Sequence, residues 1–177
     1  MPVNKRILTK YPNPVFVETG TYLGAGVKAA LSAGFKEVRS IEVLEKRYEE
    51  AKVKFKNRKT VHLYLGDSVK ILDQVISSVE SRMTFWLDAH YSGEGSGTGD
   101  GETYCALLGE LDAIKNHPIK DHTILIDDRR CMTEKKHFDS ISEDDVRKKL
   151  LEINPNYRIS YEDGFVADDI IVARISE

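Results

Sequence analysis

The sequence has few cysteines and no long apolar run, and these two absences exclude several classes of protein. Its two cysteines, Cys105 and Cys131, cannot build a disulfide framework and lack metal-ligand spacing, so we expect reduced thiols. No apolar stretch approaches the roughly 20 residues that span a bilayer. The basic segment 1–14 lacks the apolar core of a signal peptide. We therefore expect a cytoplasmic protein without a membrane partner.

An excess of charge of one sign is also missing. The net charge is −3, and the lysine-rich and arginine-rich segments 45–59 and 146–154 carry acidic residues at helical spacing as well. Mixed clusters of this kind are typical of solvated helix faces, whereas a nucleic-acid surface needs a basic patch. A nucleic-acid partner is therefore not expected.

Short apolar segments alternate with helix-like segments over most of the chain. The apolar segments are bounded by turn residues, as buried strands should be, and lie at 15–17, 38–41, 61–65, 83–87 and 122–126. The helix-like segments lie at about 24–33, 44–56, 67–79 and 103–116. This alternation predicts an α/β fold of the Rossmann-like, three-layer type, with a mostly parallel sheet between two layers of helices.

The end of the chain departs from this alternation. A last helix is expected over 143–153, with Ser142 as its N-cap. Two apolar segments follow with no room for a helix between them, which predicts a terminal antiparallel hairpin of Tyr157–Tyr161 with Ile170–Ile175. Because no repeat or linker is present, we expect residues 1–177 to form a single domain.

A glycine-rich turn follows the first strand. Gly20, Gly24 and Gly26 do not have the G-x-G-x-x-G spacing of a dinucleotide site, but glycine still lets the backbone approach a ligand closely. Glu18, at the end of the strand, would repel a pyrophosphate. It would suit a ligand that carries a positively charged amino-acid end.

Two further acidic residues stand at the ends of the next two strands. Glu42 can accept both hydroxyls of a ribose, and Asp67 can accept a hydrogen bond from an adenine amino group. Asp67 also precedes a helix, so helix capping explains it equally well when it is taken alone. Three acids at successive strand ends, after a glycine turn, favour an adenosine-containing ligand.

Together with the terminal hairpin, these positions resemble a class I S-adenosylmethionine-dependent methyltransferase over nearly the whole chain. The resemblance implies a seven-stranded sheet of order 3-2-1-4-5-7-6 with an antiparallel strand 7. It implies that Glu18 and Gly20 lie near the methionine end of the cofactor, that Glu42 holds the ribose, and that Asp67 with Ser68 faces the adenine. The expected cofactor-binding residues are Glu18, Gly20, Thr21, Tyr22, Gly24, Glu42, Asp67, Ser68 and Asp88. The chain departs from the commonest glycine motif of the family, because Thr21-Tyr22-Leu23 stands before Gly24.

Acidic residues also end the fourth and fifth strands. Asp88 follows the fourth strand, and Asp127 and Asp128 follow the fifth, so neighbouring strands would bring the three carboxylates together. They would repel one another unless a hard divalent cation such as Mg²⁺ held them. The alternative is that Asp127 and Asp128 only end a strand and cap a turn.

This second group of residues is similar to metal-dependent O-methyltransferases, both the catechol type and the type resembling macrocin O-methyltransferase. The resemblance implies that Asp88, Asp127 and Asp128 bind Mg²⁺, which would bind a hydroxyl of a small-molecule acceptor and lower its pKa. His90, two residues after Asp88, is the natural general base, so Asp88 and His90 are the expected catalytic residues. His90 could equally be a metal ligand or a structural loop residue.

The glycine-rich stretch 91–102 predicts a long loop directly after the fourth strand. Either it closes over the site as a lid, or it is a surface insertion. Other functions for the same fold also stay open: methylation of RNA or protein, binding of an adenosyl ligand without catalysis, or a metal-dependent hydrolase. The acceptor and the oligomeric state, including a homo-oligomer that covers the site, are not determined by the sequence.

Overall fold

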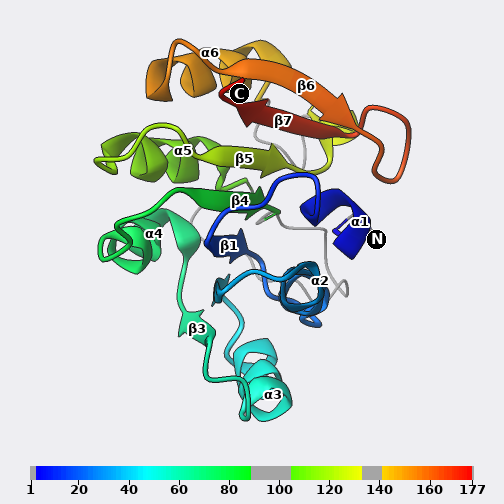
Figure 1. Cartoon of the computed structure of the whole chain (residues 1–177), viewed down its shortest axis with the longest axis vertical. Coiled ribbons are helices and arrows are strands. Elements are labelled where there is room, and N and C mark those ends of the chain that lie inside the picture. Colours follow the sequence, from blue (N-terminus) through cyan, green and yellow to red (C-terminus); the bar gives the residue numbers. More distant parts are fainter. Residues whose placement is uncertain (1–2, 89–104, 133–140, 177) are drawn as a thin grey trace.

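The protein is described here from a computed structural model, in which residues 3–88, 105–132 and 141–176 are described. These residues form a seven-stranded sheet with the order β3-β2-β1-β4-β5-β7-β6 (Figure 1). The strands are β1 Val15–Thr19, β2 Glu37–Glu42, β3 Val61–Leu65, β4 Met83–Leu87, β5 Thr123–Ile126, β6 Arg158–Glu162 and β7 Ile170–Arg174. β1 to β5 pair in parallel, and β7 pairs antiparallel with both β5 and β6. The expected strand order and the terminal hairpin are confirmed.

Helices cover both faces of the sheet, which completes the expected three layers (Figure 1). They are α1 Lys5–Leu8, α2 Ala25–Ala33, α3 Glu45–Phe55, α4 Ser68–Ile76, α5 Leu107–Asn116 and α6 Glu143–Ile153, with one 3₁₀ turn, η1, at Arg129–Cys131. Apolar side chains of α1, α2 and α3 form one core cluster with the sheet, and those of α4, α5 and α6 form the other. The short helix α1 was not expected from the sequence.

Each central strand contributes side chains to both cores, because successive side chains point to opposite faces of a sheet. In β1, Val15 and Val17 belong to the core beneath α4–α6, whereas Phe16 belongs to the core beneath α1–α3. Trp86 of β4, the only tryptophan in the sequence, is 1% exposed and packs in the core beneath α1–α3. The near-continuous apolar runs are therefore the mark of strands that are covered on both sides.

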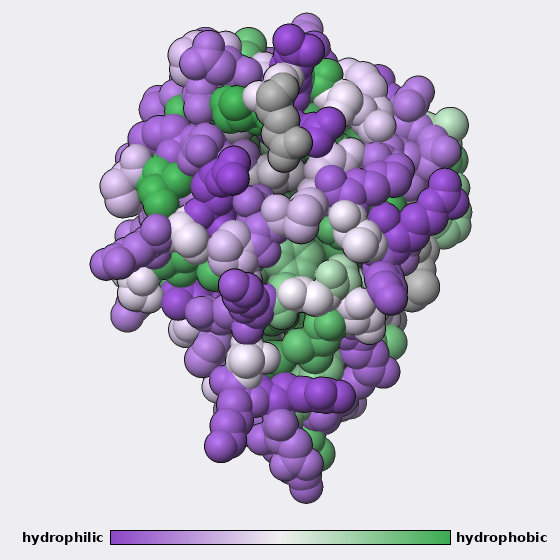
Figure 2. Space-filling view, viewed as in Figure 1, coloured by the Kyte–Doolittle hydropathy of each residue, from purple (hydrophilic) through white to green (hydrophobic). Residues whose placement is uncertain are grey.

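The outer surface is mostly polar. The face seen in Figure 2 is hydrophilic over most of its area, with apolar side chains gathered near its centre. The mixed-charge segment of the sequence is α3, whose buried residues are Ala51 and Phe55 alone. Its charged residues therefore form a solvated helix face. In residues 3–88, 105–132 and 141–176, we find no helix with the length and apolar character needed to cross a membrane.

The amino ends of β4 and β5 are closed by a buried histidine pair. The Nδ1 atom of His122 accepts a hydrogen bond from the backbone N–H of Met83 at 3.1 Å, so its Nε2–H donates to Nδ1 of His117, also at 3.1 Å. The Nε2–H of His117 then donates to the carbonyl of Val79 at 3.1 Å. Burial lowers the pKa of His122 to about 4. The ring of His122 is therefore neutral at pH 7, and the nitrogens of both rings are used within the fold.

Asn13 joins the same end of the sheet from the N-terminal segment. Its side-chain amide donates to the carbonyl of Met83 at 3.1 Å and to the hydroxyl of Thr84 at 3.0 Å. The hydroxyl of Thr84 in turn donates to the carbonyl of Tyr11 at 2.7 Å. The amino edge is thus held by polar groups that satisfy one another.

Candidate functional site

The acidic residues singled out in the sequence lie at the opposite edge, where β1 to β5 end. Glu18 is the second-last residue of β1, and Glu42 is the last residue of β2. Asp67 lies two residues after the end of β3, Asp88 directly follows β4, and Asp127 directly follows β5. Parallel pairing of Leu87 with Ile126 places the residues that follow them side by side. The edge therefore gathers these acids in the order in which the strands lie in the sheet.

The turn after β1 has a left-handed backbone at three positions. Gly20 (φ 85°) and Gly24 (φ 71°) are glycines, for which this conformation carries little strain, but Tyr22 (φ 46°) is not. The Thr21-Tyr22-Leu23 insertion is accommodated because the backbone N–H of Tyr22 donates to Oε2 of Glu42 at 2.7 Å. The turn thus depends on the acid at the end of the neighbouring strand.

Glu18 supports this turn from beneath. It is 2% exposed, and its Oε1 accepts a hydrogen bond from the Ser40 hydroxyl at 2.7 Å. Its Oε2 would lie 1.7 Å from a Cβ on Gly26, so only glycine fits at that position. Burial raises the pKa of Glu18 to about 8. The carboxyl group is therefore largely protonated at neutral pH and does not present a full negative charge to a ligand.

Glu42 is also buried, but its oxygens are used differently. Oε2 accepts from the N–H of Tyr22, and Oε1 accepts from the N–H of Leu44 at 2.9 Å. A carboxylate oxygen has two lone pairs, so each oxygen keeps acceptor capacity for a ribose hydroxyl. Its two backbone bonds fix the orientation that such a contact needs.

At the end of β3, Asp67 and Ser68 have different surroundings. Asp67 is the N-cap of α4 and accepts from the N–H of Val69 at 3.1 Å, so the capping explanation holds. Ser68 is buried, and its hydroxyl donates to Oε1 of Glu110 on α5 at 2.5 Å. The Ser68 side chain is thus directed at α5, which the resemblance did not imply.

Glu110 was missed from the sequence. It is 1% exposed and also receives a hydrogen bond from Thr19 at the end of β1. Burial raises its pKa to about 7. The signal was present, because Glu110 lies three residues after Leu107 and four before Ile114, on the buried stripe of α5. An acid on an apolar stripe indicates a specific polar partner.

Asp88, Asp127 and Asp128 come together as expected. One carboxylate oxygen from each lies within 4.8 Å of the others. Oδ1 of Asp127 accepts from the N–H of Asp128 at 2.8 Å, whereas its Oδ2 is buried without a hydrogen-bond partner among the described residues. Burial, and then the charge of Asp88, raises the pKa of Asp127 well above its usual range. A buried carboxylate oxygen without a described partner, in a cluster with two other acids, fits a hard divalent cation.

Arg129, which directly follows the aspartate pair in the sequence, has partners on another part of the fold. Its guanidinium pairs with Glu143 of α6 at 2.7 Å and lies 4.6 Å from the ring centroid of Tyr161 in β6. It therefore ties η1 to the neighbouring elements. The expectations for His90 as a base and for residues 92–101 as a lid fall outside the described residues.

The turns at this edge are hydrogen-bonded to the ends of neighbouring strands. The bonds run from Gly66 N to Glu42 O (2.9 Å), from Gly20 N to Ile41 O (3.0 Å), from Asp88 N to Thr19 Oγ1 (3.3 Å) and from Asp127 N to Leu87 O (3.1 Å). They continue the pairing of the sheet past its strands, from β3 across to β5. The adenosine-side and aspartate-side turns therefore belong to one connected line of contacts.

No protein-family model matches this chain, and no curated protein matches it in sequence. Solved structures do match it. The SAH-bound methyltransferase PaMTH1 of Podospora anserina has a TM-score of 0.64 and 14% identity, over 98% of this chain and 76% of that one. An O-methyltransferase of Bacillus cereus in complex with SAH has a TM-score of 0.65 and 14% identity, over 97% and 78%.

Human N-acetylserotonin methyltransferase in complex with SAM is a third match, with a TM-score of 0.60 and 14% identity, over 99% of this chain and 52% of that one. At these identities the matches show the fold alone. The chain has the Rossmann-like fold of class I methyltransferases, with a sheet of order 3-2-1-4-5-7-6.

Proposed function

We propose that this protein is an S-adenosylmethionine-dependent methyltransferase that transfers the methyl group to an oxygen of a small hydroxylated acceptor with the help of Mg²⁺. The observation that carries the proposal is the cluster of Asp88, Asp127 and Asp128 at the same sheet edge as the glycine turn, with a buried oxygen of Asp127 that has no partner among the described residues. Structural neighbours bound to SAM or SAH support the cofactor.

The cofactor would lie across the ends of β1, β2 and β3. Glu42 would accept the ribose hydroxyls, since its orientation is already fixed by two backbone bonds. Asp67 would accept from the adenine amino group while Oδ1 continues to cap α4, because a carboxylate can accept several hydrogen bonds. The backbone of Gly20 would allow close approach of the methionine end.

The acceptor would lie at the ends of β4 and β5. Asp88, Asp127 and Asp128 would hold the cation, which when bound supplies Lewis-acid chemistry that lowers the pKa of the acceptor hydroxyl. His90 would remove the hydroxyl proton, and the fixed strand ends would hold acceptor and cofactor in line for methyl transfer.

Calorimetric titration with S-adenosylmethionine and S-adenosylhomocysteine, with and without MgCl₂, tests the proposal. We expect micromolar binding that Glu42→Ala weakens by at least about tenfold, since a buried charge-assisted pair of contacts is lost. Glu45→Ala is the matched control, because Glu45 is exposed three residues further on and should leave affinity unchanged.

Binding of neither ligand would contradict the proposed cofactor. The metal-dependent hydrolase would then become the better explanation of the aspartate cluster. Binding without methyl transfer to any hydroxylated acceptor, in the presence of MgCl₂, would instead favour an adenosyl-binding protein.

A further inference from the structure

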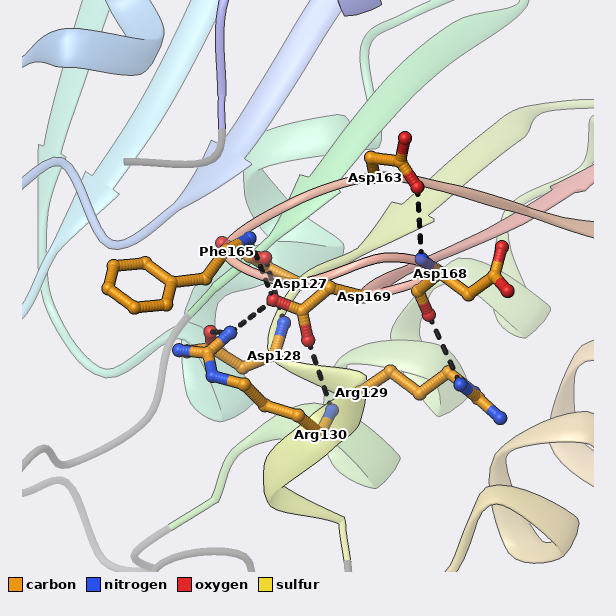
Figure 3. A network of polar contacts seen from close by, with 8 residues as sticks. All are labelled: Asp127, Asp128, Arg129, Arg130, Asp163, Phe165, Asp168 and Asp169. Atoms are coloured by element: carbon orange, nitrogen blue, oxygen red, sulfur yellow. Dashed lines mark hydrogen bonds and ion pairs between the residues drawn. The ribbon is translucent and has the colours of Figure 1, made fainter.

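Arg130 lies beside the aspartate cluster and joins it to the hairpin of β6 and β7 (Figure 3). Its Nη1 is 2.5 Å from Oδ1 of Asp128 and also pairs with Oδ2 of Asp169. Asp128 is one of the three acids expected to hold a cation. One oxygen of that acid is therefore already paired with a positive charge from within the fold.

Asp169 holds Arg130 in this position through contacts with its side chain and its backbone. Its side chain is fully buried, and it accepts hydrogen bonds from the backbone N–H of Arg130 at 3.1 Å and of Phe165 at 3.0 Å. The ring of Phe165 lies 5.0 Å from the guanidinium carbon, although 71% of the residue is exposed. The hairpin thus holds the guanidinium from two sides.

The neighbouring arginine shows that this placement is specific. Arg129 carries the same charge one residue earlier, but Figure 3 shows its side chain pointing away from that of Arg130. It donates to the carbonyl of Asp168 at 3.2 Å and pairs with Glu143 of α6. Only the second arginine reaches the cluster, so Arg129 offers a matched comparison of equal charge.

A positive charge on Asp128 has a direct effect on a cation at the same acid. It neutralises part of the negative charge that would attract the cation, and it repels the cation at short range. We propose that Arg130, held by Asp169 and Phe165, is an internal counter-ion that sets the affinity of the Asp88–Asp127–Asp128 site for a divalent cation. This inference rests on the proposed metal site.

Because the counter-ion balances the cluster, it also stabilises the protein when no cation is bound. Two variants therefore have opposite expected effects on binding. Removing the charge of Arg130 should tighten binding of the cation. Removing the charge of Asp169 should weaken it, because the guanidinium would then pair with Asp128 alone. A role for Arg130 that only orients Asp128 would give weaker binding when Arg130 is replaced.

The experiment is calorimetric titration of the full chain with MgCl₂ alone. We expect Arg130→Gln to bind Mg²⁺ at least roughly tenfold more tightly than the wild type, from the Coulomb energy of one nearby charge. We expect Asp169→Asn to bind it more weakly and Arg129→Gln to bind it as the wild type does. The Asp169→Asn measurement decides the inference if Arg130→Gln does not fold.

Equal or weaker binding by Arg130→Gln, or tighter binding by Asp169→Asn, would overturn the inference and leave the proposed metal site intact. If the wild type binds no Mg²⁺ but Arg130→Gln does, the counter-ion role is supported and the metal-dependent function is not. Absence of binding in all four proteins would overturn both.

Discussion

The two edges of the sheet use buried polar groups in opposite ways. At the amino edge, His117, His122 and Asn13 are hydrogen-bonded within the fold. At the carboxyl edge, Glu18 is buried with a raised pKa and Asp127 keeps a partnerless oxygen. Polar groups that satisfy one another stabilise a fold, whereas buried acids with unused capacity cost stability and suit binding. The amino edge therefore holds the structure, and the carboxyl edge is the one suited to a ligand.

The same contrast appears in the expected response to pH. The pKa of His122 is lowered from 6.5 to about 4, so its contribution to stability is complete above pH 6.5 and is lost as the pH falls toward 4. The pKa of Glu18 is raised from 4.5 to about 8, so its contribution is complete below pH 4.5 and is lost as the pH rises toward 8. A fall in pH therefore lowers the stability contributed by the amino edge, and a rise in pH lowers the stability contributed by the carboxyl edge.

The largest expected effect is on activity, and it comes from Asp127→Asn at the carboxyl edge. Asp127 is a proposed ligand of the cation, so a neutral amide in its place should lower metal-dependent methyl transfer by at least about a hundredfold. Burial already raises the pKa of the Asp127 carboxyl group, so a neutral amide resembles its protonated form, and the protein without ligands should melt no lower than the wild type. Activity assays and thermal unfolding measure the two effects. Full activity in this variant would show that Asp127 is not a metal ligand.

His122→Ala should have the next largest effect, and it should fall on stability alone. The variant leaves the N–H of Met83 unsatisfied and opens a cavity, so we expect a loss of about 3 kcal/mol in the free energy of unfolding. Urea unfolding measures this loss. Titration of the folded variant with S-adenosylhomocysteine should give the wild-type affinity, and a large change there would mean that the two edges are not independent.

Glu18→Gln should act mainly on the pH dependence of stability. Glutamine resembles the protonated carboxyl group, so the variant should lack the loss of stability that ionisation of Glu18 causes, while Glu110 and Asp127 still ionise in both proteins. Between pH 6.5 and 8, where His122 is already neutral, the wild type should lose up to about 1.4 kcal/mol per pH unit relative to the variant. Urea unfolding at several pH values measures the slope. Exposed Glu45→Gln is the control, and parallel slopes for wild type and Glu18→Gln would count against the raised pKa.

Much of the carboxyl edge was predictable from the sequence, because parallel strands that are buried on both sides read as apolar runs, and whatever follows each run must lie at a common edge. This argument, together with the strand order that the family resemblance implied, predicted that Asp88 and Asp127 lie close together, and the pairing of β4 with β5 confirms it. The hairpin of β6 and β7 was predicted for a similar reason, since the connection between its strands is too short for a helix.

The features that could not be predicted from the sequence depend mostly on contacts between distant parts of the chain. Helix α1 has only four residues, too few to show an apolar period. The buried position of Glu110 could be read from its helix, but its partners, Ser68 and Thr19, could not, because they are more than 40 residues away in the sequence. Asp169 was read as part of a loop, and only the fold places it against Arg130. Side-chain partners across the core are set by tertiary packing, which local patterns do not encode.

The hydrogen bonds that link neighbouring turns at the carboxyl edge have a thermodynamic consequence. Gly66, Gly20, Asp88 and Asp127 are each tied to the end of a neighbouring strand, so a ligand that fixes one turn restricts the next. We therefore expect cofactor and cation to bind with positive cooperativity. Linkage is reciprocal, so whatever factor the cation adds to the affinity for cofactor, the cofactor must add to the affinity for the cation. The sheet itself would then couple the two binding events without a moving domain.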